Sequence, residues 1–219
     1  MSPARVRVKI CGVTNREDAL AAIALGADAL GFNLYAGSKR AMVLDREAEW
    51  LATLPPFVTR VAVLVNAPLD EALRVAAHPA IHAVQFHGDE TPEYCTRFAR
   101  ESARPFVKAL RLRDASTLST ATHFSTPHLL LDADAGAAYG GAGTLIDLDL
   151  AAQFAEHAPG CTLILAGGLR AENVTDAVRK VRPFAVDVAS GVEMPDDPRK
   201  KSEERMAAFI AASAETDLS

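Results

Sequence analysis

The stretch TRVAVLVNAPLDEALRVAAHPAIHAVQFHG, residues 59–88, contains one complete strand–helix–strand unit. Its two ends are short runs of apolar and β-branched residues, whereas residues 69–78 place apolar side chains at helical spacing among charged ones. Strands that are apolar on both faces and are each followed by a helix are typical of a buried parallel sheet. This unit therefore predicts an α/β fold.

The same unit recurs along the whole chain. Strand patterns lie at residues 6–12, 27–35, 59–66, 81–88, 104–112, 128–134, 161–168 and 184–191. Helical patterns lie at residues 15–26, 45–55, 69–78, 91–102, 114–124, 147–158, 172–181 and 197–214. Eight units of roughly 27 residues can close a sheet on itself, so we expect residues 1–219 to form a single-domain (β/α)₈ barrel. The alternative is an open doubly wound sheet, but residues 12–18 match its glycine-rich turn poorly.

The composition narrows the class of protein. Hydrophobic residues make up 49% of the chain, which is enough for a large core and excludes general disorder. A net charge of -5 argues against nucleic-acid binding, and three cysteines without a C-x-x-C pair argue against a disulfide framework or a zinc site. Neither a secretory signal nor an apolar run long enough for a membrane span is found. We expect a soluble cytoplasmic protein.

A barrel of this kind carries its function at the carboxyl ends of its strands. The seventh strand pattern ends in LAGGL and the eighth in VASGVE, which place Gly167, Gly168, Ser190 and Gly191 at adjacent strand ends. Glycines let backbone N–H groups approach an anion closely, and this pair of loops commonly holds a phosphate. We therefore predict a phosphate site, with simple tight turns as the alternative.

Titratable side chains also lie at strand ends. Cys11 ends the first strand and is either a reactive thiol or an inert small core residue. Lys9 is expected on the opposite face, so no activation of Cys11 is assigned to it. Asp132 ends the sixth strand and is either an acid at the barrel mouth or a turn cap, with Asp134 as a rival. Lys108, on the fifth strand, is a candidate Schiff-base nucleophile or an inward-facing partner of a carboxylate.

Six stretches in chain order form a wider pattern. They are KICGVTN (9–15), GFNLYAGSKR (31–40), VQFHGDE (84–90), LLLDAD with YGGAGTLID (129–134 and 139–147), LAGGLRAENV (165–174) and VDVASGVE (186–193). Together they resemble the phosphoribosylanthranilate isomerase family of tryptophan biosynthesis, from the first strand to the start of the last helix.

The resemblance implies an Amadori rearrangement of N-(5-phosphoribosyl)anthranilate to the 1-deoxyribulose 5-phosphate derivative, without a metal or an organic cofactor. By position, Cys11 matches the family's general base and Asp132 its general acid. A base of this kind needs a pKa below the roughly 8.5 of a free cysteine. The implied partner is a small phosphorylated substrate, with neither nucleic acid nor membrane, and the enzyme is a monomer or homodimer.

Further positions match the family's binding residues. Arg40 falls at the arginine that binds anthranilate, where a flat guanidinium can cover a ring and contact its carboxylate. Asp187 matches an aspartate that accepts hydrogen bonds from sugar hydroxyls. Gln85 and His87 match a motif that lines the pocket. Gly168, Ser190 and Gly191 match the phosphate loops, with Gly167 beside them.

Several positions depart from the family pattern. Lys39 replaces a proline next to Arg40, and the segment after residue 193 lacks the usual Gly-Lys-Asp ending, so no role is assigned to Lys200. Substitutions in the sixth loop, which affect packing near the acid, are Ala142, Ile146 and Leu148.

Three alternative functions stay open. The first is a Schiff-base lyase or aldolase that uses Lys108. The second is a barrel that binds a phosphorylated ligand without catalysis. The third is a dual-substrate isomerase that also serves histidine synthesis, but that class resembles aspartate-based catalysts, whereas the first-strand position here is Cys11.

Overall fold

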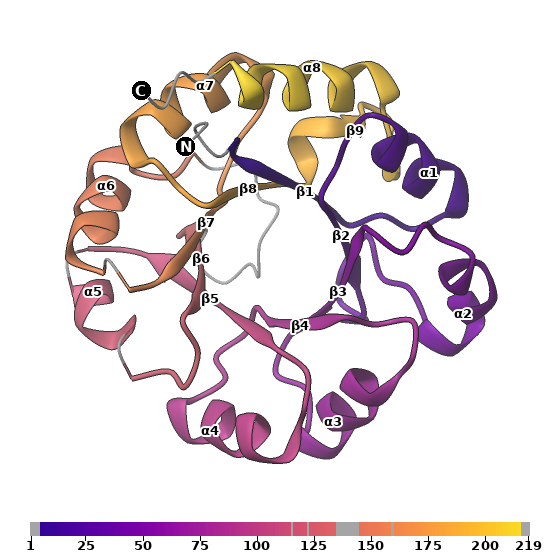
Figure 1. Ribbon diagram of the computed structural model, residues 1–219, viewed down its shortest axis with the longest axis horizontal. Coiled ribbons are helices and arrows are strands. Elements are labelled where there is room, and N and C mark those ends of the chain that lie inside the picture. The colour runs from indigo at the N-terminus through magenta and orange to yellow at the C-terminus, as the bar shows by residue number, and fades with distance from the viewer. Residues whose placement is uncertain (1–4, 115, 122, 135–144, 159, 216–219) are drawn as a thin grey trace.

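The computed structural model describes residues 5–114, 116–121, 123–134, 145–158 and 160–215. Strands β1 to β8 form a closed parallel barrel in sequence order, with β8 paired back to β1. Figure 1 looks down the barrel and shows the helices as an outer ring around the strands. The predicted (β/α)₈ barrel is confirmed, and the open doubly wound sheet is wrong because closure leaves the main sheet without an edge.

The helices and strands of the barrel agree with the predicted patterns in order and approximate position. The strands are β1 Arg7–Cys11, β2 Ala29–Asn33, β3 Thr59–Leu64, β4 Ala83–Phe86, β5 Phe106–Leu112, β6 His128–Ala133, β7 Thr162–Leu165 and β8 Ala185–Val188. The helices are α1 Arg16–Ala24, α2 Leu44–Ala52, α3 Leu69–Ala77, α4 Pro92–Glu101, α5 Ser116–Ala121, α6 Leu148–His157, α7 Ala171–Val181 and α8 Glu203–Ala214.

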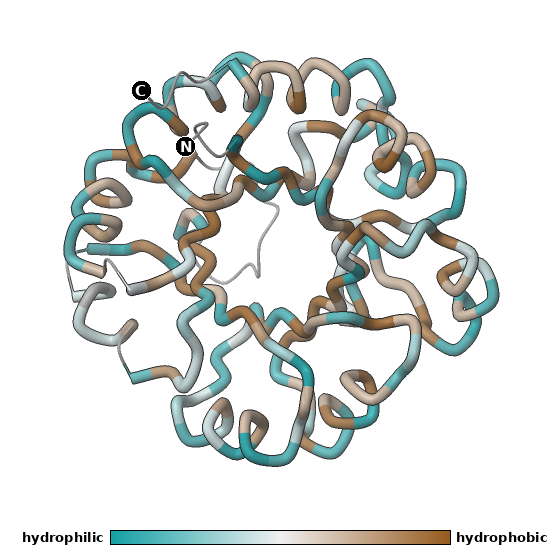
Figure 2. Tube along the Cα trace, viewed as in Figure 1, coloured by the Kyte–Doolittle hydropathy of each residue, from teal (hydrophilic) through white to brown (hydrophobic). Residues whose placement is uncertain are grey.

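The core has two layers, because successive side chains on a strand point to opposite faces. The outward-facing residues of the strands pack against the helices and make the larger apolar cluster. A smaller cluster of Ala109, Leu130 and Ala166 lies inside the barrel. Figure 2 shows apolar residues concentrated along the strands and polar residues on the outer sides of the helices. A strand residue of known parity can therefore be assigned to the interior or to the helix layer.

The last helical pattern begins later than the sequence predicts. Residues 197–214 are not one helix, because Asp197–Lys201 form strand β10, which pairs antiparallel with β9, Glu193–Met194. A one-turn 3-10 helix, η1 Ser190–Val192, precedes β9. Helix α8 begins after Ser202, whose side chain accepts a hydrogen bond from the Arg205 N–H. The β9–β10 hairpin places a short polar segment over the carboxyl ends of β8 and β1.

Candidate active site

Cys11 and Lys9 share one face of β1, the face that points into the barrel. Lys9 lines an interior cavity of about 220 Å³ together with residues of β4, β5 and β7. A Cβ added to Gly31 on β2 would lie 2.8 Å from the Cys11 sulfur and 3.0 Å from the Lys9 nitrogen. The predicted opposite orientation of Lys9 is therefore wrong, because residues two apart on a strand point the same way.

Lys9 forms a buried ion pair with Asp187. Its Nζ lies 2.7 Å from Oδ1 of Asp187, which stands opposite Lys9 in the β1–β8 register. Burial alone would lower the pKa of Lys9, but the carboxylate of Asp187 and the neighbouring Cys11 raise it above its ordinary value. Lys9 is thus a fixed positive charge beside the thiol. Asp187 has the predicted place at the mouth, with one oxygen held by the lysine.

The electrostatics of Cys11 differ from the expectation. Burial raises the pKa of the thiol, and the Asp187 carboxylate raises it further, whereas Lys9 and Lys201 lower it without outweighing the other two. The expectation of a pKa below that of a free cysteine is therefore wrong. Cys11 is a neutral thiol near neutral pH, and it becomes a base only when its proton leaves.

Asp132 lies near the end of β6 with its side chain toward the interior. It has the same parity as Leu130, which packs inside the barrel with residues of β5 and β7. Its Oδ1 accepts a hydrogen bond from the Ala133 N–H at 2.9 Å, and its Oδ2 lies 3.1 Å from Nε2 of His87. The carboxyl group is therefore held at two points, at the barrel mouth and three strands away from Cys11.

His87 links Asp132 to Gln85 on β4. The Gln85 amide nitrogen lies 2.8 Å from Nδ1 of His87. When this amide donates to Nδ1, the imidazole carries its proton on Nε2 and donates it to Asp132. The Gln85 amide oxygen is buried and has no hydrogen-bond partner among the described residues. The two predicted lining residues are thus linked to Asp132 itself, which the sequence pattern does not reveal.

Arg40 follows β2 and is oriented by a carboxylate from the other end of the chain. Its Nη2 donates to Oε2 of Glu193 at 3.0 Å, and its Nε contacts the other oxygen of that carboxylate. Nη1 donates no hydrogen bond to any residue that the structure describes. A Cβ on Gly12, which has φ +72°, would lie 2.2 Å from Cδ of Arg40, so the arginine lies across the backbone next to Cys11.

The glycine-bearing loops after β7 and β8 lie against each other. Gly167 and Gly168 have φ values of 89° and 65°, which favour glycine. A Cβ at Gly191 would lie 2.2 Å from the Leu169 carbonyl oxygen, so only glycine allows this approach of the two loops. Ser190 begins the 3-10 turn beside them. All four residues of the predicted phosphate site therefore lie together at one side of the barrel mouth.

Lys108 does not reach the barrel mouth. It has the parity of the outward-facing residues of β5, and its side chain is 3% exposed. Its Nζ lies 2.7 Å from Oε2 of Glu90 and 2.8 Å from the Gly88 carbonyl oxygen. The lysine is paired with a carboxylate, but it faces outward rather than inward. A buried, ion-paired amine of this kind is not placed to attack a substrate.

The sequence analysis also named one further acid, Asp134, and three substitutions in the sixth loop. Asp134 forms an ion pair with Arg113 just beyond β6, with Oδ2 3.2 Å from Nε. Ile146 is buried, and its N–H donates to the Gly167 carbonyl oxygen at 3.2 Å, so this departure from the family pattern supports the phosphate loop. Leu148 packs partly buried at the start of α6. Ala142 lies outside the described residues.

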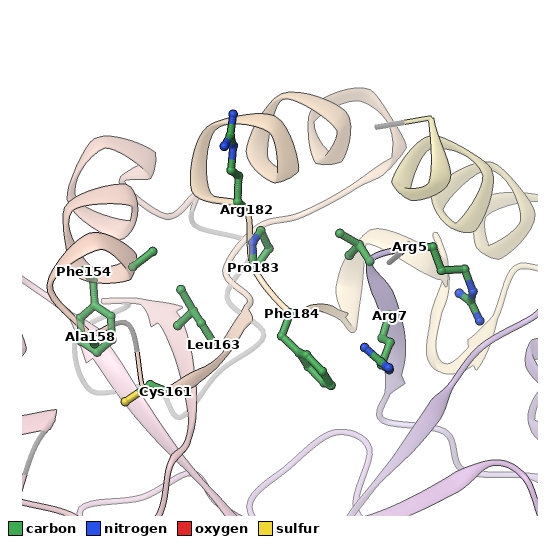
Figure 3. A pocket seen from close by; sticks show the side chains of 11 residues that line it. Arg5, Arg7, Phe154, Ala158, Cys161, Leu163, Arg182, Pro183 and Phe184 are labelled. Atoms are coloured by element: carbon green, nitrogen blue, oxygen red, sulfur yellow. The ribbon is translucent and has the colours of Figure 1, made fainter. Parts of the chain in front are cut away.

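A larger pocket of about 340 Å³ lies on the opposite face, where β1, β7 and β8 begin. In Figure 3, Arg7 and Phe184 point toward one another, and the guanidinium carbon of Arg7 lies 4.2 Å from the ring centre. None of the predicted site residues lines this pocket.

In the described part of the chain, no three His, Cys, Asp or Glu side chains are grouped to hold a metal ion. No described helix is long and apolar enough to cross a membrane.

Comparison with known proteins decides the family. The model of the N-(5'phosphoribosyl)anthranilate (PRA) isomerase family matches residues 8–212. The chain belongs to this family. A relative from Acidithiobacillus ferrooxidans named N-(5'-phosphoribosyl)anthranilate isomerase is 44% identical over 212 residues, which cover 94% of this chain and 96% of the relative.

Solved structures agree with this assignment. A phosphoribosyl anthranilate isomerase in complex with reduced 1-(o-carboxyphenylamino)-1-deoxyribulose 5-phosphate has a TM-score of 0.82 and 38% identity, covering 95% of this chain and 98% of the other. A structure of monomers generated from the dimeric isomerase of Thermotoga maritima has a TM-score of 0.81 and 37% identity, with the same coverage. The predicted activity, an aldose–ketose isomerisation of a small phosphorylated substrate in tryptophan biosynthesis, is confirmed.

The sequence analysis assigns no role to three charged groups that the structure places at the site. They are the ammonium of Lys9, the carboxylate of Glu193 and the ammonium of Lys201. The i, i+2 spacing of Lys9 and Cys11 is a signal that could have placed the lysine beside the thiol. No local signal could have paired Glu193 with Arg40, because 153 positions separate the two residues.

Proposed function

We propose that Cys11 is the general base and Asp132 the general acid in the rearrangement of N-(5-phosphoribosyl)anthranilate to 1-(2-carboxyphenylamino)-1-deoxyribulose 5-phosphate. The observation that carries this proposal is that Cys11 and Asp132 both occupy inward-facing positions on their strands. Each lies at the mouth of the barrel interior, on strands three apart, and the glycine loops after β7 and β8 lie between those strands. A sugar phosphate anchored at these loops would have one group on each side.

The chemistry divides between the two groups. Protonated Asp132 donates its proton to the ring oxygen, the C1–O bond of the furanose breaks, and the nitrogen lone pair forms an iminium with C1. The Cys11 thiolate then takes the proton from C2, and the C–H electrons form an enolamine while the iminium nitrogen regains its pair. Tautomerisation moves the enol proton to C1 and gives the ketone. Acid and base each handle one proton, so the reaction is an isomerisation without an external oxidant.

The other predicted residues would position the substrate. Arg40 keeps Nη1 available for the anthranilate carboxylate while Glu193 holds its other edge. Asp187 keeps one oxygen for the sugar hydroxyls, and Gly168, Ser190 and Gly191 supply backbone donors for the phosphate. His87 would stabilise the carboxylate that Asp132 becomes after it gives up its proton.

The test is steady-state turnover of phosphoribosylanthranilate by Cys11→Ala and Asp132→Asn, coupled to the next pathway enzyme. We expect each change to lower kcat by about 10²–10⁴, the usual contribution of a positioned proton-transfer group. Cys161→Ser, a half-buried cysteine on the opposite face, should keep full activity. Near-normal turnover in either site variant would remove that residue from the mechanism. A wild-type protein that binds the product but does not turn over substrate would favour the non-catalytic alternative.

We infer that the chain is one domain and forms a homodimer, as the dimeric Thermotoga maritima isomerase does. The fully exposed side chain of Phe57, on the face opposite the catalytic residues, supports a contact there with a second copy.

The half-buried thiol of Cys11 must stay reduced to act as a base, which favours the cytoplasm. No activity is expected on the aminoaldose substrate of histidine synthesis.

A further inference from the structure

The β9–β10 hairpin carries a chain of charged contacts that ends at the substrate arginine. Lys201 is fully buried, and its Nζ lies 3.3 Å from Oε1 of Glu193 and 3.1 Å from the Ala189 carbonyl oxygen. Glu193 in turn binds the Nε and Nη2 edge of Arg40. Burial alone would raise the pKa of Glu193, but Arg40 and Lys201 hold it below its ordinary value, so the carboxylate stays charged.

The same hairpin also fixes the backbone on both sides of Arg40. Nη1 of Arg199 donates to the Ala41 carbonyl oxygen at 2.9 Å and to the Lys39 carbonyl oxygen at 3.3 Å. The Arg199 carbonyl oxygen accepts a hydrogen bond from the hydroxyl of Thr14, in the loop after β1. These contacts hold the segment in which Lys39 replaces the family's proline, so the loop that presents Arg40 is held without that ring.

Lys201 also lies close to the thiol. The Ala189 carbonyl that it binds directly follows Val188, which stands opposite Ile10 in the β1–β8 register, so the ammonium lies beside the end of β1. The charged groups that act on Cys11 are Lys9 on the same strand, Asp187 on β8, Lys201 on β10 and Arg40 after β2. Lys201 is therefore the one member of the hairpin that connects the arginine to the base.

We propose that Lys201 is a positioning residue of the isomerase site: through Glu193 it sets the orientation of Arg40, and its ammonium places a second positive charge next to Cys11. This inference rests on the proposed roles of Arg40 and Cys11. Burial removes the hydration of the Lys201 ammonium, and its contacts with the Glu193 carboxylate and the Ala189 carbonyl offset part of that desolvation cost. Lys200, the exposed neighbour, makes no corresponding contact with the residues that the structure describes.

The experiment compares Lys201→Met and Lys201→Arg with Lys200→Met as the matched control. The first readout is the pH dependence of Cys11 alkylation by iodoacetamide, followed on the Cys11 peptide by mass spectrometry. Loss of one neighbouring positive charge in Lys201→Met should raise the alkylation midpoint by about one pH unit. Lys201→Arg, which keeps the charge, should leave the midpoint near that of the wild type, and Lys200→Met should not change it.

The second readout is KM for phosphoribosylanthranilate, with the fold checked by thermal unfolding. Lys201→Met and the isosteric Glu193→Gln should each raise KM roughly tenfold, because a displaced Arg40 would lose about 1.4 kcal/mol of its binding energy for the substrate. Glu193→Gln should not raise the alkylation midpoint. If Lys201→Met folds with an unchanged midpoint and KM, the proposal is wrong. If it does not fold, an unchanged KM in Glu193→Gln is sufficient to overturn it. Full activity of Cys11→Ala would overturn the proposed base, while the alkylation shift would still report on Lys201.

Discussion

At the scale of single residues, the site places the Cys11 thiol in an environment that disfavours its charged form. Burial and Asp187 keep the proton on Cys11, while Lys9 and Lys201 limit the rise of its pKa. A thiol of this kind is a stronger base once deprotonated than one with a depressed pKa, because basicity follows the pKa. The site therefore holds less thiolate at neutral pH, but the thiolate that does form is a stronger base.

This balance predicts the pH dependence of Cys11 reactivity. The pKa of Cys11 in the folded enzyme lies above its ordinary value, so the thiolate fraction increases as pH rises toward and through that pKa. We expect the rate of Cys11 alkylation by iodoacetamide, which follows the thiolate alone, to rise about tenfold per pH unit above neutrality and to level off only above the roughly 8.5 of a free cysteine. The measurement is the alkylation rate of the wild type as a function of pH, followed on the Cys11 peptide. A rate that levels off near neutral pH would contradict the raised pKa of Cys11.

The residue scale also shows what sequence reasoning could and could not find. Cys11 and Asp132 could be selected because each ends an apolar strand, and both lie at the barrel mouth as predicted. The direction of the Cys11 pKa shift could not be predicted, because it depends first on how deeply the thiol is buried and then on charges such as Asp187 and Lys201, which are distant in sequence. Lys9 and Asp187 are 178 positions apart, and only barrel closure brings them together.

At the scale of secondary-structure elements, the loops after β7 and β8 depend on glycine for geometry. Gly167 has φ 89°, and a Cβ there would lie 2.6 Å from the Ala133 backbone nitrogen and 3.0 Å from Cβ of Ile146. Relief of that clash would move β6 and the phosphate loop apart. The strand that carries Asp132 and the loop that would hold the phosphate are therefore packed directly against one another.

The prediction at this scale is that Gly167→Ala lowers both stability and substrate affinity. We expect the free energy of unfolding, measured in urea, to fall by roughly 1–3 kcal/mol, the cost of a strained backbone conformation, with a further loss from the clash. KM for phosphoribosylanthranilate should rise. The matched control is Gly26→Ala, since Gly26 has φ 100° but no atom of a described residue within 4 Å of the added Cβ. Equal stability losses and an unchanged KM in both variants would show that the contact with Ala133 is unimportant.

Elements differ in how far the sequence predicts them. The eight barrel strands follow from apolar runs and turn residues, and their order follows from the alternation with helices. The β9–β10 hairpin is missed because its charged residues 197–201 continue the helical pattern of the segment after it. Those residues pair with Glu193 and with the loop that carries Arg40, and these are tertiary contacts that override local propensity.

At the scale of the whole molecule, closure of the barrel creates the site. Strands β1, β6, β7 and β8 bring Cys11, Asp132, the glycine loops and Asp187 around one opening, although these residues span nearly the whole chain. The hairpin then adds Glu193 and Lys201 over the same opening. The opposite face carries the pocket of Figure 3 and the exposed Phe57, and it contributes no residue to the proposed chemistry.

The most direct measurement is a crystal structure of the enzyme with reduced 1-(2-carboxyphenylamino)-1-deoxyribulose 5-phosphate. We predict the Cys11 sulfur on one side of the sugar chain and an Asp132 oxygen on the other, each about 3–3.5 Å from the atom it would serve. The phosphate should contact Gly168, Ser190 and Gly191, and the anthranilate carboxylate should contact Arg40. A ligand that leaves either Cys11 or Asp132 out of reach of the sugar would contradict the account.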